Sequence, residues 1–266
     1  GYESGQKSYE LLTGDWKGIA TMDNKSFTLY PLGGGLQIYT NNVHKFGTDA
    51  ILLSRFSSPR INDIACDFGT GCGIIPLLWC RGKAPKSVTA VDIQPDAIEL
   101  VEKSVGLNGL SGRITPMLAD LKALPSEMAG KFTLVTMNPP YKKLTGGLIS
   151  PENGRAIARH EIKCNLDDIV KAAARLLKPS GRLCMCHRPE RLADLICAMR
   201  EYGVEPKRLR TVSNRTDSAP SLVLCEGRKG GATGMTVEPS LIIETDSGEY
   251  TAQMKEIYAE FTAKEN

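Results

Sequence analysis

Long apolar runs are missing from this sequence of 266 residues. A helix that crosses a membrane needs about 20 consecutive apolar residues, and no segment approaches that length. We see no signal peptide at the start of the sequence, and no internal repeat or low-complexity tract further along it. These absences argue against membrane-spanning and repeat architectures, and we expect a cytoplasmic globular protein.

A strong excess of charge is also missing. The formal net charge is +3 and the pI is about 8.4, which is compatible with a nucleic-acid partner without requiring one. Apolar residues make up 41% and charged residues 24% of the chain, as in ordinary globular domains. The length suffices for one sizeable α/β domain with an extension.

The eight cysteines include no C-x-x-C pair. Cys184 and Cys186 alternate on one expected strand and therefore face the same side of a sheet. The other cysteines are scattered, mostly within apolar segments. This pattern favours buried, reduced side chains over a metal or redox site, and we expect no bound metal.

From residue 61 onward, strand patterns alternate with helix patterns, which is typical of βαβ units and a mainly parallel sheet. We therefore predict an α/β domain over 61–266, with a seven-stranded, mostly parallel sheet and helices on both faces. We expect residues 1–60 to be an N-terminal extension of this single domain, with a hairpin over 29–42 and a short helix over 47–56. A hairpin-like piece and a helix end the chain over 241–261. The expected strands cover 61–69, 87–93, 113–120, 131–138, 181–187, 208–213 and 221–227, and the expected helices cover 74–81, 94–109, 165–181 and 188–203.

A glycine-rich loop, DFGTGCGI (67–74), lies between the first of these strands and the helix that follows. Glycines at this spacing let the backbone approach a ligand closely. A dinucleotide loop reads G-x-G-x-x-G, whereas position 74 here is Ile, which disfavours an NAD enzyme. The next two strands end in Asp92 and Asp120. Because ligands of open α/β sheets bind at the carboxyl ends of the strands, we expect these carboxylates to face one crevice.

The fourth strand ends in Asn138-Pro139-Pro140-Tyr141. Proline has no N–H and stops a strand, so the prolines extend the backbone and leave carbonyl groups without local partners. The Asn138 side-chain oxygen and the Pro139 carbonyl oxygen can each accept one N–H of an exocyclic amine, which would aim the nitrogen lone pair at an electrophile bound at the glycine loop. Tyr141 can stack on a planar base, a contact worth about 1–3 kcal/mol. Positioning and electrostatics, rather than a strong general base, would then drive the reaction.

These motifs resemble those of S-adenosylmethionine-dependent methyltransferases of class I, which have a Rossmann-like fold. N-P-P-Y occurs in the members that methylate planar nitrogens: adenine N6 in DNA and RNA, cytosine N4, and the glutamine amide of release factors. Over nearly its whole length the chain looks like the bacterial tRNA1(Val) (adenine-37-N6)-methyltransferase family. The segments that carry this likeness are HKFGTDAILLSRF (44–56), residues 159–183 and residues 238–258. Met137 stands where the family pattern has Ser, and Asp92 where Glu is common.

The resemblance implies that the cofactor is S-adenosyl-L-methionine and that the partner is RNA, with tRNA expected. It implies that Asp67 reaches the ammonium group of the cofactor, that Asp92 accepts both ribose hydroxyls, that Asp120 accepts from the adenine amine, and that Phe46–Asp49 folds over the cofactor. The implied cofactor residues are Phe46, Gly47, Thr48, Asp67, Gly69, Thr70, Gly71, Gly73, Asp92, Ile93, Asp120 and Leu121. The implied catalytic residues are Asn138, Pro139, Pro140 and Tyr141.

Basic residues near the catalytic loop are candidates for phosphate contacts. Lys142, Lys143, Arg155 and Arg159 are the RNA-binding candidates, and Lys207, Arg208, Arg210 and Arg215 form a second basic group. For any one of these residues taken alone, an ordinary solvated surface is the better explanation. Other readings stay open: a methyltransferase acting on release-factor glutamine, rRNA guanine N2 or DNA adenine, or a module that binds the cofactor without catalysis. A release-factor enzyme would carry an N-terminal helical domain, and a guanine enzyme would have Phe at position 141.

Overall fold

The computed structural model describes residues 27–139 and 165–262. Eleven strands and six α-helices are assigned within these residues, together with three short 3-10 helices. They are β1 (Thr28–Gly33), β2 (Leu36–Thr40), α2 (Thr48–Ser57), β3 (Ile64–Phe68), α3 (Ile74–Trp79), β4 (Ser87–Asp92), α4 (Pro95–Leu107), β5 (Ile114–Leu118), η1 (Leu121–Ala123), η2 (Ser126–Met128), β6 (Phe132–Met137), α6 (Leu166–Leu176), β7 (Leu177–His187), η3 (Pro189–Arg191), α7 (Leu192–Glu201), β8 (Val204–Ser213), β9 (Pro220–Lys229), β10 (Thr236–Val237), β11 (Leu241–Ile242) and α8 (Ala252–Thr262).

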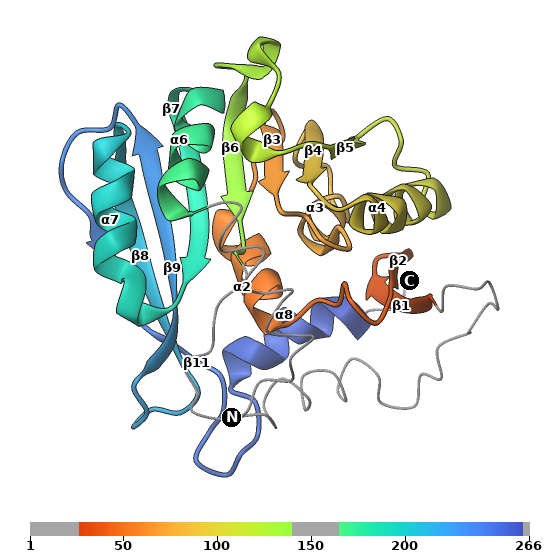
Figure 1. Cartoon of the computed structure of the whole chain (residues 1–266). Coiled ribbons are helices and arrows are strands. Elements are labelled where there is room, and N and C mark those ends of the chain that lie inside the picture. The colour runs from red at the N-terminus through yellow and green to blue at the C-terminus, as the bar shows by residue number, and fades with distance from the viewer. Residues whose placement is uncertain (1–26, 140–164, 263–266) are drawn as a thin grey trace, which may run out of the picture.

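One mostly parallel sheet organises the chain (Figure 1). Its strand order is β10-β8-β9-β7-β6-β3-β4-β5, and β11 also pairs with β8. Among the strands that the structure describes in this sheet, only β9 runs antiparallel to its neighbours, β7 and β8. All seven predicted strands are present and adjacent in this sheet, so the predicted fold class is confirmed. The sheet has nine strands in total because the two-residue strands β10 and β11 add to the edge of β8.

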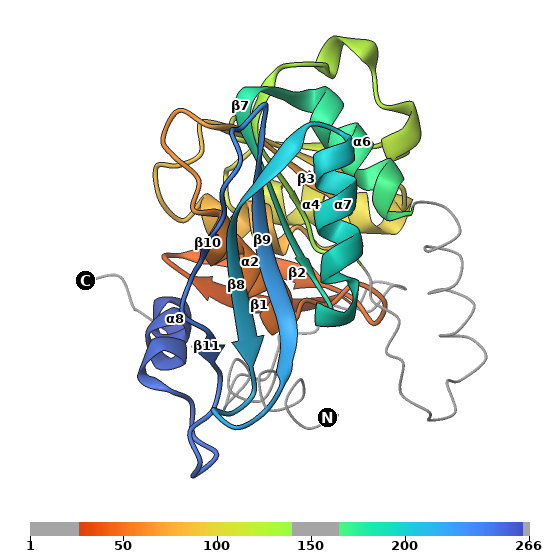
Figure 2. The same cartoon turned by 90° about the vertical axis from the view of Figure 1, so that its left-hand side faces the viewer.

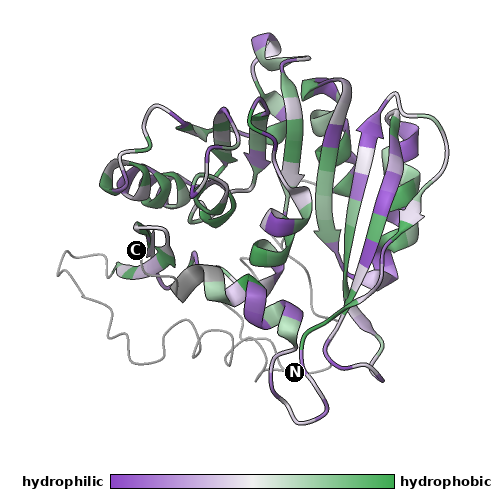
Figure 3. Cartoon of the chain, turned by 180° about the vertical axis from the view of Figure 1, so that it is seen from behind, coloured by the Kyte–Doolittle hydropathy of each residue, from purple (hydrophilic) through white to green (hydrophobic). Residues whose placement is uncertain are grey.

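Helices cover both faces of the sheet, as Figure 2 shows with the sheet turned toward its edge. The side chains of α6 and α7 pack with one face of the strands, including Phe68 and Met137. The opposite face packs against α2, α3, α4 and α8 and against the β1–β2 hairpin. Figure 3 shows hydrophobic residues concentrated on the central strands and more hydrophilic ones on β8 and β9. Within the described residues, no helix has the length and apolar character needed to cross a membrane.

The predicted helix over 165–181 ends earlier than its sequence indicates. It begins as expected, because the Asn165 side chain accepts a hydrogen bond from the Asp168 N–H at 2.8 Å in a capping box. The helix nevertheless stops at Leu176, and β7 starts at Leu177 rather than at residue 181. Leu177 is fully buried and pairs with Phe132 of β6. Strand pairing and burial therefore outweigh the local helical preference of this segment.

The segment before the sheet forms the expected hairpin and helix. β1 and β2 pair antiparallel, and α2 is mostly buried beneath the sheet. The indole N–H of Trp79 in α3 donates to the Ser54 carbonyl oxygen of α2 at 3.1 Å, which fastens the two helices together. At the far end of the chain, β11, a bridge between Glu244 and Tyr250, and α8 form the expected closing segment.

A buried cluster of charges joins α2 to three strands of the sheet and to Asp63, the residue before β3. The Arg182 guanidinium of β7, only 7% exposed, lies 3.0 Å from the Asp63 carboxylate and 3.3 Å from that of Glu226 in β9. It also donates to the Ser57 carbonyl oxygen at the end of α2 at 2.8 Å. Arg208 of β8 contacts the same Glu226 carboxylate at 3.0 Å. A buried carboxylate is costly without a partner, so each of these groups depends on the others.

We expect Arg182→Met to destabilise the fold strongly. Methionine fills similar space but leaves the Asp63 and Glu226 carboxylates without their shared cation, a change that typically costs about 3–5 kcal/mol of unfolding free energy. Urea denaturation of the full chain measures the loss. Arg191→Met is the control, because Arg191 pairs with Asp194 on the surface and its loss should cost less than about 1 kcal/mol. Equal, small losses in both variants would mean that the cluster does not hold the fold.

Candidate active site

Four parallel strands end side by side at one edge of the sheet. In the order β6-β3-β4-β5, their last residues are Met137, Phe68, Asp92 and Leu118. The Ala119 N–H donates to the Asp92 carbonyl oxygen at 3.0 Å, so the pairing of β5 with β4 continues just past the strand ends. The sequence motifs that follow these strands are thereby brought to one place.

The glycine loop after β3 is held against the end of β4. The Thr70 N–H donates to the Val91 carbonyl oxygen at 3.0 Å. Gly73, which precedes α3, has a φ of +82°, and a Cβ added there would lie 3.1 Å from a Val101 methyl group of α4. Any other residue at this position would combine backbone strain with crowding. Gly71 also has a positive φ of 56°, but the space beside it is open for 4 Å.

Asp67, the first residue of the loop motif, is buried within β3. Its Oδ1 accepts a hydrogen bond from the Thr136 hydroxyl of β6 at 2.6 Å. Burial raises the pKa of Asp67 from 3.8 to about 7, because desolvation of the charged form outweighs the opposing effect of the Thr136 hydrogen bond. The carboxyl group therefore changes its protonation state near neutral pH.

Asp92 links the end of β4 to the glycine loop. Its Oδ2 accepts from the Gly71 N–H at 2.9 Å and its Oδ1 from the Gln94 N–H at 3.0 Å. Each carboxylate oxygen has a second lone pair, so both remain able to accept from a ligand hydroxyl. The loop and the carboxylate consequently hold each other in place.

The remaining residues predicted to contact the cofactor lie next to this pair. Asp120 follows β5 and accepts from the Lys122 N–H at 2.9 Å as the N-cap of η1. Ile93, which follows β4, and Leu121 of η1 are half-buried, and Leu118 at the end of β5 is 55% exposed. An exposed apolar side chain beside a half-buried carboxylate suits a ligand with a flat ring and a polar rim.

Asn138 and Pro139 leave the end of β6 directly beside the β3 strand. The Cys186 thiol of β7 donates to Asn138 Oδ1 at 3.0 Å. Met137, at the position before Asn138, packs on the opposite face of the sheet, and its methyl group lies 3.5 Å from where a Cβ of Gly69 would be. The other predicted catalytic and RNA-binding residues lie outside the described residues: Pro140, Tyr141, Lys142, Lys143, Arg155 and Arg159.

The segment before α2 reaches the start of α4. His44 Nε2 lies 3.0 Å from the Asp96 carboxylate in the first turn of α4. Phe46 is buried with its ring edge-on to Tyr30 at 6.0 Å between centroids. The Thr48 hydroxyl meets the Tyr258 hydroxyl of α8 at 3.0 Å, and Gly47 is the N-cap of α2. In this arrangement Phe46 and Thr48 make contacts within the protein.

Arg208, Lys207 and Arg210 of the second basic group contact other protein groups, Arg208 in the buried charge cluster and the other two at the surface. Arg208 belongs to the buried charge cluster and stacks over Phe56, with 4.0 Å between guanidinium and ring centroid. The Lys207 amino group donates to the Ala232 carbonyl oxygen at 3.0 Å, and Arg210 donates to the Gln253 side chain at 3.1 Å. Arg208 therefore has a structural role, whereas Lys207 and Arg210 are half-buried and make exposed hydrogen bonds.

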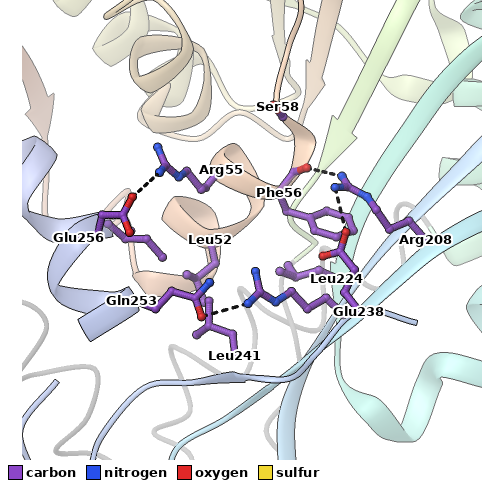
Figure 4. Close-up of a pocket in the computed structure, with 12 residues that line it drawn as sticks. Leu52, Arg55, Phe56, Ser58, Arg208, Leu224, Glu238, Leu241, Gln253 and Glu256 are labelled. Atoms are coloured by element: carbon purple, nitrogen blue, oxygen red, sulfur yellow. Dashed lines mark hydrogen bonds and ion pairs between the residues drawn. The ribbon is translucent and has the colours of Figure 1, made fainter. Parts of the chain in front are cut away.

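A hollow of about 290 Å³ lies between α2, α8 and the outer strands (Figure 4). The charged side chains around it are largely paired, for example Arg55 with Glu256 at 3.5 Å. The glycine loop, the strand-end carboxylates and Asn138 do not line it. Among the described residues, no group of three or more His, Cys, Asp or Glu side chains is arranged to hold a metal ion.

Sequence reasoning missed three contacts of the site: Asp67 with Thr136, Asn138 with Cys186, and His44 with Asp96. The contact of Thr136 could have been suspected from the sequence, because Thr136 is a polar residue within the otherwise apolar end of a central strand. Cys186 gives no such signal, since a cysteine in a buried strand is ordinary.

Comparison with known proteins identifies the family. Residues 37–194 match the family model described as methyltransferase small domain. A Tolumonas auensis relative named tRNA1(Val) (adenine(37)-N6)-methyltransferase is 30% identical over 224 residues, covering 82% of this chain and 92% of the relative. A relative of the same name from Phocaeicola vulgatus is 29% identical and covers 88% of this chain and 95% of its own.

Solved structures agree on the fold. A predicted O-methyltransferase from Agrobacterium tumefaciens superimposes with a TM-score of 0.63 at 20% identity, covering 82% of this chain and 98% of the other. The M. jannaschii tRNA m1G37 methyltransferase gives a TM-score of 0.52 at 18% identity, covering 78% and 55%. The family match contains the glycine loop, the strand-end carboxylates and Asn138, and the chain therefore belongs to the methyltransferase small domain family, alongside relatives named tRNA1(Val) (adenine(37)-N6)-methyltransferase.

Proposed function

We propose that this methyltransferase transfers a methyl group from S-adenosylmethionine to the exocyclic N6 of an adenine in RNA, with adenine 37 of the tRNA anticodon loop as the expected target. One observation carries the proposal. Asn138 and Pro139 leave β6 directly beside the strand that carries the glycine loop. Acceptors for an amine thus lie next to the loop expected to hold the methyl donor.

The residues at the sheet edge fit the cofactor. S-adenosylmethionine supplies a methyl group activated on a positively charged sulfur. Asp67 would hold its ammonium group, Asp92 its ribose hydroxyls and Asp120 its adenine amine. The open space beside Gly71 supports close approach of a ligand to the loop backbone. Three carboxylates at successive strand ends supply acceptors where the cofactor has donors.

Asn138 and Pro139 would orient the substrate nitrogen. The lone pair of an exocyclic amine is delocalised into its ring and attacks poorly. When Asn138 Oδ1 and the Pro139 carbonyl oxygen each accept one N–H, the nitrogen moves toward tetrahedral geometry and its lone pair turns to the methyl group. The methylated nitrogen is briefly cationic and acidic, so its proton passes to water without a strong base.

The relatives favour tRNA as the substrate class, since their names specify adenine 37 of a tRNA. An anticodon loop suits an enzyme of this kind, because an unpaired base costs less to expose than a base in a duplex. Since Arg208 of the second basic group is held in the buried charge cluster, we expect phosphate contacts mainly from Lys142, Lys143, Arg155 and Arg159.

Methyl transfer from labelled S-adenosylmethionine tests the proposal. Unmodified total tRNA, unmodified rRNA and a release factor would be offered separately, and labelled RNA digested to nucleosides. We expect label in tRNA as N6-methyladenosine, and loss of that label when adenine 37 of the accepting tRNA is changed to guanine. Label only in protein, or only in rRNA guanine, would overturn the substrate class. The Asn138→Ala variant, purified in the same way, controls for contaminating enzymes.

Asn138→Ala should lower kcat by about 10²–10³-fold, the usual cost of removing one group that stabilises a transition state by hydrogen bonding. Cofactor affinity, measured by calorimetry, should change less than about twofold. Asn108→Ala is the matched control, because the Asn108 amide joins α4 to β2 through Gln37 and lies outside the site. Equal losses of turnover and cofactor affinity in Asn138→Ala would instead make Asn138 a structural residue.

Binding of S-adenosylhomocysteine should tighten as pH rises from 6 to 7.5. The Asp67 pKa of about 7 means that the carboxyl group is mostly neutral at pH 6 and mostly ionised at pH 7.5. An ammonium group binds the ionised form, so the apparent Kd should fall by up to about eightfold over this range. Calorimetry at the two pH values measures the change. Asp67→Asn should bind more weakly at pH 7.5 and lose the pH dependence; a dependence that survives in this variant would assign the titration to another group.

A further inference from the structure

Cys186 is placed to act on the amide of Asn138. Its thiol lies 3.0 Å from Asn138 Oδ1, in donor geometry, and its side chain is fully buried. Cys186 sits near the carboxyl end of β7, between the Asn138 position of β6 on one side and Leu224 of β9 on the other. The thiol therefore reaches the site from within the sheet, without competing for the space in front of it.

The strand register accounts for this contact. Parallel pairing of Met137 with Met185 puts the next residue of each chain segment, Asn138 and Cys186, side by side and on the same face. Since β6 ends at Met137 while β7 continues to His187, Asn138 lies just beyond the last paired residue of its own strand. The Asn138 side chain therefore contacts Cys186 on strand β7, although the Asn138 backbone is no longer part of β6.

We propose that Cys186 is a positioning residue that fixes the orientation of the Asn138 amide for methyl transfer. This inference rests on the proposed role of Asn138 as an acceptor for the substrate amine. The side-chain amide of Asn has an acceptor oxygen and a donor nitrogen, and rotation of the amide by 180° exchanges their positions. A thiol donor on the β7 side keeps the oxygen in place and disfavours the turned amide. An amide oxygen has two lone pairs, so it can accept from a thiol and from a substrate N–H together.

Cys184 offers a comparison within the same strand. It is two residues earlier, fully buried on the same face, and its thiol contacts the Glu226 carboxylate at 3.7 Å rather than any residue of the site. If cysteines on this face serve only packing, truncating either one should have a similar effect on activity. If Cys186 positions Asn138, only its own truncation should slow the reaction.

The experiment compares Cys186→Ala, Cys186→Ser and Cys184→Ala in the full chain. With the tRNA substrate, Cys186→Ala should lower kcat about five- to tenfold, as expected for loss of one modest hydrogen bond, with the KM for tRNA and the Kd for S-adenosylhomocysteine nearly unchanged. Cys186→Ser keeps a donor and should recover most of kcat. Cys184→Ala should leave kcat within about twofold. An unchanged kcat in Cys186→Ala, or equal losses in the Ala and Ser variants, would overturn the inference.

A second readout separates this inference from the proposed function. The side-chain NH₂ signal of Asn138, in protein labelled with ¹⁵N-asparagine, is assigned by its loss in Asn138→Ala. It should shift in Cys186→Ala and stay in place in Cys184→Ala. If the wild-type enzyme methylates none of the offered substrates, the proposed function fails, and an Asn138 signal that is unchanged by Cys186→Ala overturns the positioning role on its own.

Discussion

The register of β3 against β6 is the constraint on which the candidate site depends. Asp67 pairs with Thr136 and Phe68 with Met137, so the glycine loop and Asn138 leave adjacent strands at the same level. A slip of one residue would turn Asn138 to the opposite face, away from Cys186 and toward α6. The hydrogen bond from Thr136 to Asp67 joins the two strands through their side chains just before this point. Strand pairing, rather than the loops themselves, sets the distance between the loop expected to bind the cofactor and the expected acceptors.

The two halves of the sheet use their polar side chains differently. On the β3–β5 side, the buried carboxylate of Asp92 and the half-buried carboxylate of Asp120 lie at the edge where we expect a ligand to bind. On the β7–β9 side, Arg182, Glu226 and Arg208 satisfy one another beneath α2. A charged side chain in such a buried cluster is needed for stability, because moving it away would leave its partners buried without a counter-charge. Arg208 of the second basic group is therefore part of the fold, whereas Lys207 and Arg210 make their contacts at the surface.

Much of the fold could be predicted from the sequence, because each element has a local signal. Alternating strand and helix patterns, the glycine loop and the Asn165 cap all lie where they were predicted. The predicted end of α6 was wrong. Leu177 leaves the helix because it pairs with Phe132, a residue far away in the chain, and local sequence does not show this pairing. The contacts of Thr136, Cys186 and Arg182 also join strands that meet only in the folded sheet. The spacing of residues in the sequence therefore does not predict them. The roles of Asp92, Asp120 and Asn138 toward ligands stay predictions that the proposed experiments address.

The short strands at the two edges of the sheet affect whether molecules of this protein can aggregate by pairing their sheets. An uncovered border strand offers unpaired N–H and C=O groups to the border of another molecule. Here β10 and β11, together with the Glu238 and Ile243 N–H groups, occupy much of the free side of β8. At the opposite border, β5 is five residues long and has Pro116 at its middle, where no N–H is available. Both borders are thus poor templates for adding a further strand, which favours separate molecules over aggregates joined through their sheets.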